Sequence, residues 1–399
     1  MEHVLRNATV LTPLERLPGA HVAFSGGRLT GIGKNVRGGA PGVDLTGYTV
    51  APGFIDMHVH GGGGYSLIDG DPRDLQGFRQ WVVRTGVTGF LMSVMAATPE
   101  ELVVAVQENK VEVGRGDGGA CCLGFHLEGP FLSPRRRGAF DPSWFRLPDK
   151  GTMDDLLRAG EGTVRVVTVA PELPGAPELI QHVSQMGVLV ALGHTDATYE
   201  DFMAGVRAGA RHVTHCYNTM RGFGHREPGA MGAALVAPVT AELITDGVHV
   251  HPAAMDLLMR MKGPGDVVLV TDAMAGAGLS DGVYPLAGRE VHVRQGRAVL
   301  ADGTLAGSVL TMDQAVRNVV GVVGRPVHEA IRMATWNPAR CLNLHTRKGL
   351  LAPGMDADLV ILDRELEVAA VLVAGRVAYC RERERELFSA LPRWAADDR

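Results

Sequence analysis

Histidine and carboxylate residues recur at the ends of short apolar runs in this sequence, and together they have the chemistry of a catalytic metal site. His58 and His60 are two residues apart, so in a strand both imidazoles point to the same face. Buried imidazoles need partners. A divalent metal is a natural one, because neutral imidazole is a common metal ligand. The HxH pattern alone is weak, since it also occurs by chance.

Three further ligand candidates follow later runs: Glu128 in HLEGPF, His194 in GHTDAT and His215 in THCYN. A carboxylate at Glu128 can bind one metal or bridge two. Two histidines and a carboxylate leave an open position for water, as in catalytic zinc sites. His126 shares a strand face with Glu128 and is either a hydrogen-bonding partner of a ligand or a satisfied core histidine.

Asp272 ends the last of these runs, VVLVTDA. A carboxylate beside a metal-bound water can take its proton and pass it to a leaving group. We therefore predict that Asp272 is the general base and then the general acid. Asp246 and Glu172 also end apolar runs, and for both we favour an interpretation as helix N-caps. A carboxylated lysine is the competing metal bridge, but none of the five lysines ends an apolar run.

Eight apolar runs position these side chains. They span residues 54–60, 89–94, 123–129, 165–172, 188–194, 212–218, 241–247 and 267–273. Helix-like stretches separate the runs, and this alternation predicts parallel βαβ units that close into an α/β fold of the (β/α)8, TIM-like type. Active sites of this fold lie at the carboxyl ends of the strands, where the candidate residues fall.

The two ends of the chain have a different character. Residues 1–50 and the segment from 349 alternate apolar positions with Gly-rich turns, which predicts β-hairpins. We expect the two parts, 1–50 and 349–399, to pair into one small β-sandwich domain, with the barrel of residues 51–348 inserted between them. The tail RERERELFSALPRWAADDR predicts a surface helix followed by a loose end.

Composition excludes several classes of protein. The 399 residues are 46% hydrophobic and carry a net charge of −5, which is typical of a globular chain and unfavourable for non-specific nucleic-acid binding. Five cysteines without a CxxC pair argue against a disulfide framework and suit a reducing cytosol. The sequence has neither a signal-peptide pattern nor a run of about 18 apolar residues, so we expect a cytoplasmic protein without membrane contact.

At these residues the sequence resembles the amidohydrolase superfamily and, within it, the family of N-acetylglucosamine-6-phosphate deacetylases. The motifs are PGFIDMHVHGGGG, HLEGPF, GHTDAT, THCYNTM, HREPG, DGVHV, VTDAMAGAG, AGSVLTMDQA and PGMDADLVILD. The resemblance implies hydrolysis of the acetamide of N-acetylglucosamine 6-phosphate to glucosamine 6-phosphate and acetate, in amino-sugar catabolism or cell-wall recycling. It also implies a hydrolase barrel with a divalent metal cofactor.

The resemblance assigns roles by position. Glu128, His194 and His215 would hold the principal metal. His58 and His60 would hold a second one with Glu128 as the bridge, so each subunit would bind one or two ions. Zinc is the first expectation, with iron, manganese or cobalt as alternatives, because the donor types alone do not select among them.

The partner implied by the resemblance is a phosphorylated amino sugar. Arg226 in HREPG would bind the phosphate and would reach the site of the neighbouring subunit, which implies a homodimer. The other substrate-binding candidates are Ala139, Asn218, Thr219, His249, Ala306, Gly307 and Ser308. Two simpler interpretations stay open: Arg226 forms a surface ion pair with Glu227, and the basic run 135–137 is a solvated loop rather than an attractor of anions.

One position departs from the family pattern. Phe140 stands where many relatives carry histidine. A phenyl ring cannot donate a hydrogen bond, so either activity is lower, or the metal polarises the carbonyl alone, or the preferred sugar differs. The alternative functions are therefore deacetylation of N-acetylgalactosamine 6-phosphate or hydrolysis of a different amide.

Overall fold

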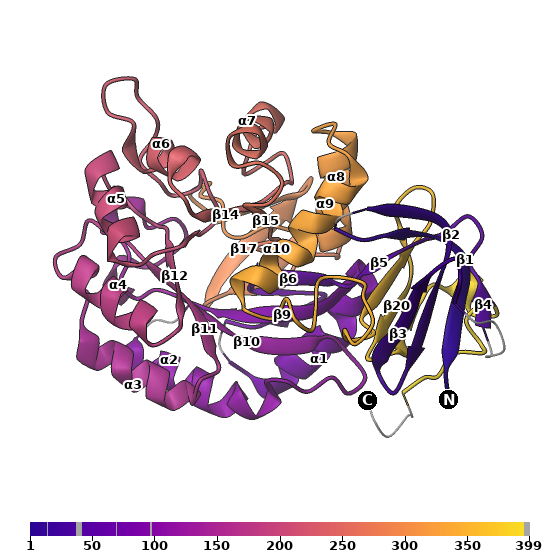
Figure 1. Cartoon of the computed structure of the whole chain (residues 1–399). Coiled ribbons are helices and arrows are strands. Elements are labelled where there is room, and N and C mark those ends of the chain that lie inside the picture. The colour runs from indigo at the N-terminus through magenta and orange to yellow at the C-terminus, as the bar shows by residue number, and fades with distance from the viewer. Residues whose placement is uncertain (14, 37–41, 69, 96–97, 395–399) are drawn as a thin grey trace.

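Eight parallel strands form the barrel at the centre of the molecule, as the sequence predicted (Figure 1). The computed structural model describes residues 1–399 apart from 14, 37–41, 69, 96–97 and 395–399. The barrel strands are β6 (Phe54–Val59), β9 (Val87–Val94), β10 (Cys121–Glu128), β11 (Val164–Val169), β12 (Leu189–Leu192), β13 (His212–Val213), β14 (Thr240–Leu243) and β15 (Val267–Leu269). Each strand pairs with the next in this order, and every one falls within or overlaps one of the eight apolar runs.

Backbone hydrogen bonds between the first and last barrel segments close the ring. The amide of Asp272 donates to the carbonyl of His58 at 2.9 Å, and the amide of His60 donates to the carbonyl of Ala273 at 2.8 Å. Strands that are buried on both faces have continuous runs of apolar residues, which is why these segments do not alternate between apolar and polar residues. The closure lies at the carboxyl ends of the strands, beside the candidate site.

The helices lie around the outside of the strands (Figure 1). They are α1 (Pro72–Val82), α2 (Pro99–Asn109), α3 (Lys150–Gly160), α4 (Ala176–Gln185), α5 (Tyr199–Ala208), α6 (Gly229–Val236), α7 (Pro252–Lys262), α8 (Met312–Gly321), α9 (Val327–Ala334) and α10 (Trp336–Cys341). Capping boxes start α2 at Thr98 and α5 at Thr198, so local sequence fixes where these helices begin. In the part of the chain that the structure describes, no helix is both long and apolar enough to cross a membrane.

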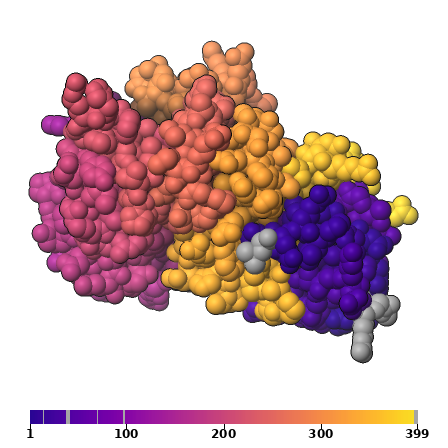
Figure 2. All heavy atoms as spheres, turned by 45° about the horizontal axis from the view of Figure 1, so that its top comes forward, coloured from indigo at the N-terminus to yellow at the C-terminus, as the bar shows by residue number. Residues whose placement is uncertain are grey.

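A second sheet joins the two ends of the chain. Its strands are β1 (His3–Leu11), β2 (Arg16–Ser25), β3 (Arg28–Gly33), β4 (Gly42–Asp44), β5 (Thr49–Pro52), β19 (Leu359–Leu362), β20 (Val368–Val373) and β21 (Arg376–Cys380). β5 pairs antiparallel with β19, and this pair joins the amino-terminal strands to the carboxyl-terminal strands in one sheet. This β domain sits against one side of the barrel (Figure 2). It confirms the composite domain, while the boundaries at 50/51 and 348/349 stay a prediction.

The charged tail does not form the expected surface helix. Among the described residues of the tail, the only helical segment is a three-residue 3-10 turn, Glu382–Glu384, and Phe388 and Leu391 are buried in the core of the β domain. Arg381 pairs with Asp363 at 2.9 Å, which ties the tail to the sheet. Burial of the two apolar side chains therefore overrides the local helix preference. The loose end expected at residues 395–399 lies outside the described residues.

A small antiparallel sheet follows the last barrel strand and was not expected from the sequence. It contains β16 (Gly282–Leu286), β17 (Arg289–Arg294) and β18 (Arg297–Val299). A separate two-stranded sheet follows the first barrel strand and contains β7 (Gly61–Gly62) and β8 (Tyr65–Ser66). Leu286 and Val291 from this sheet share an apolar cluster with Met95, Leu132 and Phe140 from the loops after the barrel strands. The sheet thus packs over the carboxyl end of the barrel.

Candidate metal and active site

Six side chains meet at the carboxyl end of the barrel, as the sequence predicted. They are His58, His60, Glu128, His194, His215 and Asp272, and all six residues are buried. They form two groups whose donor atoms are close enough to hold an ion: His58 with His60 and Asp272, and Glu128 with His194 and His215.

The carboxylate of Glu128 faces both groups. Its Oε1 lies 3.1 Å from Nε2 of His194 and 3.1 Å from Nε2 of His215. Its Oε2 lies 3.2 Å from Nε2 of His60 and 3.5 Å from Nε2 of His58. One oxygen thus serves each group, which is the arrangement that a bridging carboxylate requires.

The proton positions on two imidazoles show that the site suits a cation. Nδ1 of His60 donates to the carbonyl of Ser93 at 3.1 Å, and Nδ1 of His194 donates to the carbonyl of Arg136 at 2.9 Å. A carbonyl only accepts, so each neutral ring presents the Nε2 lone pair to the centre. Nε2 of His194 also lies 3.0 Å from Nε2 of His215. Converging lone pairs and carboxylates are the donor set of a divalent metal site.

The buried carboxylates attract positive charge to this centre. Burial opposes ionisation of Glu128, but His58 and His194 hold the pKa of that carboxyl well below its usual value. Burial also opposes protonation of His60, yet the carboxylates of Asp272 and Glu128 raise its pKa to about 9. The same field that draws a proton to His60 favours a metal cation.

Asp272 connects the candidate metal ligands to the pocket. Its Oδ1 lies 3.2 Å from Nε2 of His60 and 3.6 Å from Nε2 of His58. The side chain is 13% exposed, against 3% for Glu128, so Asp272 can also reach a molecule in the pocket. Although burial opposes ionisation, His58 and His60 hold the pKa of Asp272 below its ordinary value, and the group is a carboxylate at neutral pH.

Three of these residues have left-handed backbone conformations. The φ angles are +45° at His194, +26° at His215 and +48° at Asp272. Such angles cost a non-glycine residue about 1–3 kcal/mol and cluster at functional sites, where the surrounding structure enforces them. Here they turn each side chain inward as its strand ends.

A pocket of about 240 Å³ opens above this site, and five of the six side chains line it, all but His58. Five of the predicted substrate residues line it: Ala139, Asn218, Thr219, His249 and Gly307. Ala306 and Ser308 lie behind its wall. The Ser308 hydroxyl donates to the carbonyl of Thr271 at 2.5 Å, and Ala306 is buried in the apolar cluster under the small sheet. The structure therefore brings part of the predicted substrate site together.

Arg226 lies apart from the pocket of its own chain. It is exposed on the loop between β13 and α6 and does not line the pocket. The alternative ion pair with Glu227 does not form: Glu227 lies 3.6 Å from Arg221 and accepts from the amide of Gly229 at 3.0 Å. Across the described ranges, Arg226 has no acidic partner.

Asp246 is not a helix cap, and this corrects the sequence interpretation. The N-cap of α7 is His251. Asp246 instead accepts from the amides of Val248 at 2.9 Å and His249 at 2.8 Å, and from Nδ1 of His249 at 2.7 Å. Three bonds to this turn fix the imidazole of His249 at the edge of the pocket. Burial opposes protonation of His249, but Asp246 raises its pKa.

Glu172 is not a helix cap either. The N-cap of α4 is Gly175. Glu172 accepts from the hydroxyl of Thr195 at 2.5 Å and from the amide of Asp196 at 2.6 Å. These contacts hold the loop after β12, which carries His194. Glu172 thus supports a neighbouring loop rather than the helix that follows it.

Two of the three arginines in the basic run 135–137 form ion pairs with Asp196. Asp196 lies 2.8 Å from Arg136, 3.5 Å from Arg135 and 3.0 Å from Arg221. Hydrogen bonds from Arg221, stronger than the opposing effect of burial, lower the pKa of Asp196 to about 2. Most of the charge of the run is therefore paired, and Arg137 is exposed beside it.

Phe140 supplies an apolar wall to the pocket. Its ring meets His194 edge-on, with centroids 5.0 Å apart and planes at 80°. It also packs with Trp144 and shares the cluster that contains Leu286. His126 is a satisfied core histidine: Ser93 Oγ lies 3.1 Å from Nδ1, and Thr168 Oγ1 lies 2.8 Å from Nε2.

Sequence reasoning missed two buried acids. Glu242 in β14 lies 2.9 Å from Nδ1 of His58 and 3.1 Å from Nε2 of His212. Asp56 in β6 accepts from the hydroxyl of Thr271 at 2.6 Å, and burial raises its pKa to about 7. The available signal was a carboxylate inside an apolar run, since a buried acid needs partners.

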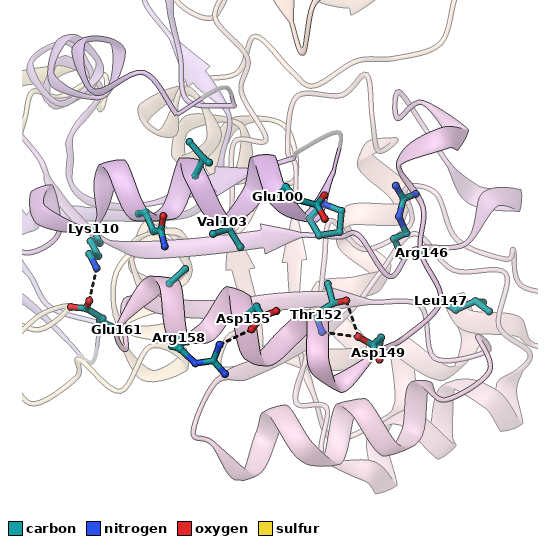
Figure 3. Close-up of a pocket in the computed structure, with 14 residues that line it drawn as sticks. Glu100, Val103, Lys110, Arg146, Leu147, Asp149, Thr152, Asp155, Arg158 and Glu161 are labelled. Atoms are coloured by element: carbon teal, nitrogen blue, oxygen red, sulfur yellow. Dashed lines mark hydrogen bonds and ion pairs between the residues drawn. The ribbon is translucent and has the colours of Figure 1, made fainter.

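A larger groove lies on the outside of the barrel. It measures about 970 Å³ and is lined by side chains of α2, α3 and the loop before α3 (Figure 3). Four of its charged groups form two ion pairs: Lys110 with Glu161 at 2.5 Å and Arg158 with Asp155 at 2.6 Å. None of the six side chains at the carboxyl end of the barrel lines it.

Known proteins resemble the chain over nearly its full length. It is 36% identical to the N-acetylglucosamine-6-phosphate deacetylase of Lysinibacillus sphaericus, over 94% of this chain and 97% of that protein. It is 42% identical to the N-acetylgalactosamine-6-phosphate deacetylase of Escherichia coli O157:H7, over 82% and 87%. The structure of N-acetyl-D-glucosamine-6-phosphate deacetylase from Mycobacterium smegmatis superposes with a TM-score of 0.90 at 40% identity, over 94% and 99%.

The family assignment agrees with the site. The model of the amidohydrolase family matches residues 49–378, a range that contains all six side chains at the carboxyl end of the barrel. That range also contains the closing strands of the barrel and the pocket above them. The chain therefore belongs to the amidohydrolase family.

Proposed function

We propose that this chain hydrolyses the acetamide of N-acetylglucosamine 6-phosphate to glucosamine 6-phosphate and acetate, in amino-sugar catabolism or cell-wall recycling. The observation that carries the proposal is the carboxylate of Glu128 between two ligand groups, with Asp272 at 3.2 Å from His60 and open to the pocket. Relatives named for this activity match almost the whole chain at 36% and 40% identity.

The cofactor we propose is a divalent metal, with zinc first and iron, manganese or cobalt as alternatives. Glu128, His194 and His215 would hold the principal ion, and His58 and His60 a second. When bound, such a cation polarises an acyl carbonyl and makes water more acidic. The paired donor groups and their shared carboxylate support this assignment.

Asp272 carries the proton in this mechanism. As a carboxylate, it accepts a proton from the attacking water while the new C–O bond forms. It then donates that proton to the amide nitrogen as the C–N bond breaks, so the amine departs without a negative charge. Asn218, Thr219 and His249 orient the sugar from the other side of the pocket.

A guanidinium group suits the phosphate best, because it can bind two phosphate oxygens at once. Among the described residues that line the pocket, none is lysine or arginine. Arg226 is exposed on a loop outside it. We therefore propose that Arg226 binds the phosphate in the neighbouring subunit of a homodimer. Large apolar side chains exposed near this loop, Phe223 at 62% and Val236 at 57%, support a partner surface there.

The location we propose is the cytoplasm. Cys121, Cys122 and Cys216 are buried free thiols, and Cys341 and Cys380 are free as well. Free thiols suit a reducing compartment.

A second substrate has specific support. The relative at 42% identity is named as an N-acetylgalactosamine-6-phosphate deacetylase. The two sugars differ in configuration at one hydroxyl, so the same metal site and the same phosphate contact serve both. The discrimination must come from side chains at the pocket wall, of which Phe140 is one.

Acetate release from both 6-phosphates tests the function. The purified protein, loaded with a divalent metal and checked by elemental analysis, should release acetate from at least one epimer. Arg226→Ala should raise KM for the phosphorylated sugar and leave KM for N-acetylglucosamine, which has no phosphate, unchanged. A metal-loaded protein that releases no acetate from either epimer would contradict the proposal. An unchanged KM in Arg226→Ala would favour a different amide substrate.

A further inference from the structure

Glu242 is a fully buried acid directly behind the metal-binding side chains. It lies in β14, and its side chain is 0% exposed. Oε2 accepts from the backbone amide of His215 at 2.8 Å and lies 2.9 Å from Nδ1 of His58. Oε1 lies 3.1 Å from Nε2 of His212. Glu242 does not line the pocket, so it does not meet the substrate.

These contacts fix the proton on His58. A backbone amide only donates, so Oε2 of Glu242 is an acceptor. The neighbouring Nδ1 of His58 must therefore carry its hydrogen, and Nε2 presents its lone pair to the centre. That Nε2 lies 3.5 Å from Glu128 and 3.6 Å from Asp272.

His212 supplies the charge that balances Glu242. Nδ1 of His212 lies 2.6 Å from Oγ1 of Thr240, whose hydroxyl donates to the carbonyl of Arg211 at 3.2 Å. The hydroxyl oxygen therefore accepts from Nδ1, and the carboxylate of Glu242 accepts from Nε2. With hydrogen on both nitrogens, His212 is an imidazolium paired with Glu242 inside the barrel.

We propose that Glu242, balanced by His212, is a positioning residue that orients His58 for metal binding and so sets the affinity of the His58–His60–Asp272 group for a divalent cation. This inference rests on the metal site of the proposed function. Partners that hold a ligand imidazole from behind typically change metal affinity by about 10–100-fold when they are removed.

The effect should be confined to one ligand group. Among the ligand side chains, Glu242 contacts that of His58, whereas it meets His215 only at the backbone amide. His60 and His194 are oriented by backbone carbonyls instead. A buried ion pair contributes little net stability, because desolvation offsets the attraction between the charges. The specific effect of the Glu242–His212 pair at this position is therefore to orient the imidazole of His58.

Glu242→Gln tests the proposal through metal binding rather than turnover. A glutamine of the same shape has one acceptor oxygen, so it cannot accept from His58, His212 and the amide of His215 as the carboxylate does. We expect Co²⁺ and Zn²⁺ to bind the His58 group about 10–100-fold more weakly in chelator competition. The absorption bands of Co²⁺ at that group should change, while the affinity of the Glu128–His194–His215 group stays within a few-fold.

Thr168→Val is the matched control. Thr168 is as deeply buried in the barrel and bonds His126 and Thr214, but it touches no ligand side chain in the described chain. Metal affinity should be unchanged in this variant. Unaltered affinity at both groups in a folded Glu242→Gln protein would overturn the proposal, as would an equal loss in Thr168→Val.

The wild-type protein provides a second test in case Glu242→Gln does not fold. Nitrogen NMR of ¹⁵N-histidine-labelled protein, with His58→Gln for assignment, should show His58 protonated at Nδ1 and bound to the metal through Nε2. Protonation at Nε2, or binding through Nδ1, would overturn the proposal. Because none of these readouts needs a substrate, failure of deacetylation would leave this inference standing, and its failure would leave the deacetylase proposal standing.

Discussion

Asp272 is the residue whose replacement best separates chemistry from metal binding. Asparagine has the same shape but cannot accept and return a proton. We predict that Asp272→Asn lowers kcat by about 10²–10⁴-fold, because one group serves both proton transfers. The metal held by Glu128, His194 and His215 should remain, since Asp272 belongs to the other ligand group.

Steady-state rates and elemental analysis on the same preparation check this prediction. A near-normal kcat would remove Asp272 from the mechanism. Loss of all bound metal would show that Asp272 is needed as a ligand rather than as a proton carrier.

His249 gives the pocket a charge that depends on pH. Burial opposes its protonation, Asp246 and Asp272 raise its pKa above 6.5, and Arg297 acts in the opposite direction. The imidazolium is therefore present below the raised pKa and is lost as the pH rises through it. A positive His249 favours an anionic sugar phosphate, so KM should rise over the same interval.

Asp246→Asn should move this interval to lower pH. The amide removes the negative charge 2.7 Å from Nδ1 of His249, and the pKa falls back toward or below its ordinary value. We expect KM of the variant to begin rising at a lower pH than in the wild type, with kcat on metal-loaded protein little changed. If KM depends on pH in the same way for the two proteins across neutral pH, the charge of His249 does not contribute to binding of the anionic substrate.

At the scale of elements, the barrel could be predicted because its strands are buried on both faces. A run such as VVLVTDA begins with four apolar residues and carries Thr271 and Asp272 near its end, which marks both the strand and the end that faces the pocket. The runs at 188–194 and 212–218 are longer than β12 and β13. The chain stops pairing with the neighbouring strands before His194 and His215, whose backbones adopt left-handed angles. A pattern of apolar residues does not reveal such a change of backbone direction.

Other elements depend on contacts that are distant in the sequence. The sheet of β16–β18 is stabilised against Ile68, Met95 and Phe140, which come from three different loops. The cap interpretation of Asp246 failed for a local reason instead: its acceptor atoms are used by the turn that holds His249. Only the closed barrel brings Glu242 of β14 next to His58 of β6.

At the scale of the whole molecule, the proposed dimer explains a site that is incomplete in one chain. The pocket is lined by four of the proposed metal ligands and by Asp272, but Arg226 projects from a loop outside it. Most soluble oligomers are symmetric, and in a two-fold dimer each chain would give its Arg226 to the other. Each working site would then contain Asp272 from one chain and Arg226 from its partner.

Mixing two impaired variants tests this arrangement directly. Arg226→Ala and Asp272→Asn should each be impaired at low substrate concentration. After joint refolding or co-expression, random pairing makes half of the dimers mixed, and each mixed dimer has one site with both original residues. We expect recovery of about a quarter of the wild-type kcat/KM. If both residues of a site come from the same chain, every site in the mixture keeps one substitution, and activity stays at the average of the two parents. That result, with dimers confirmed by light scattering, would end the shared-site proposal while leaving the metal chemistry untouched.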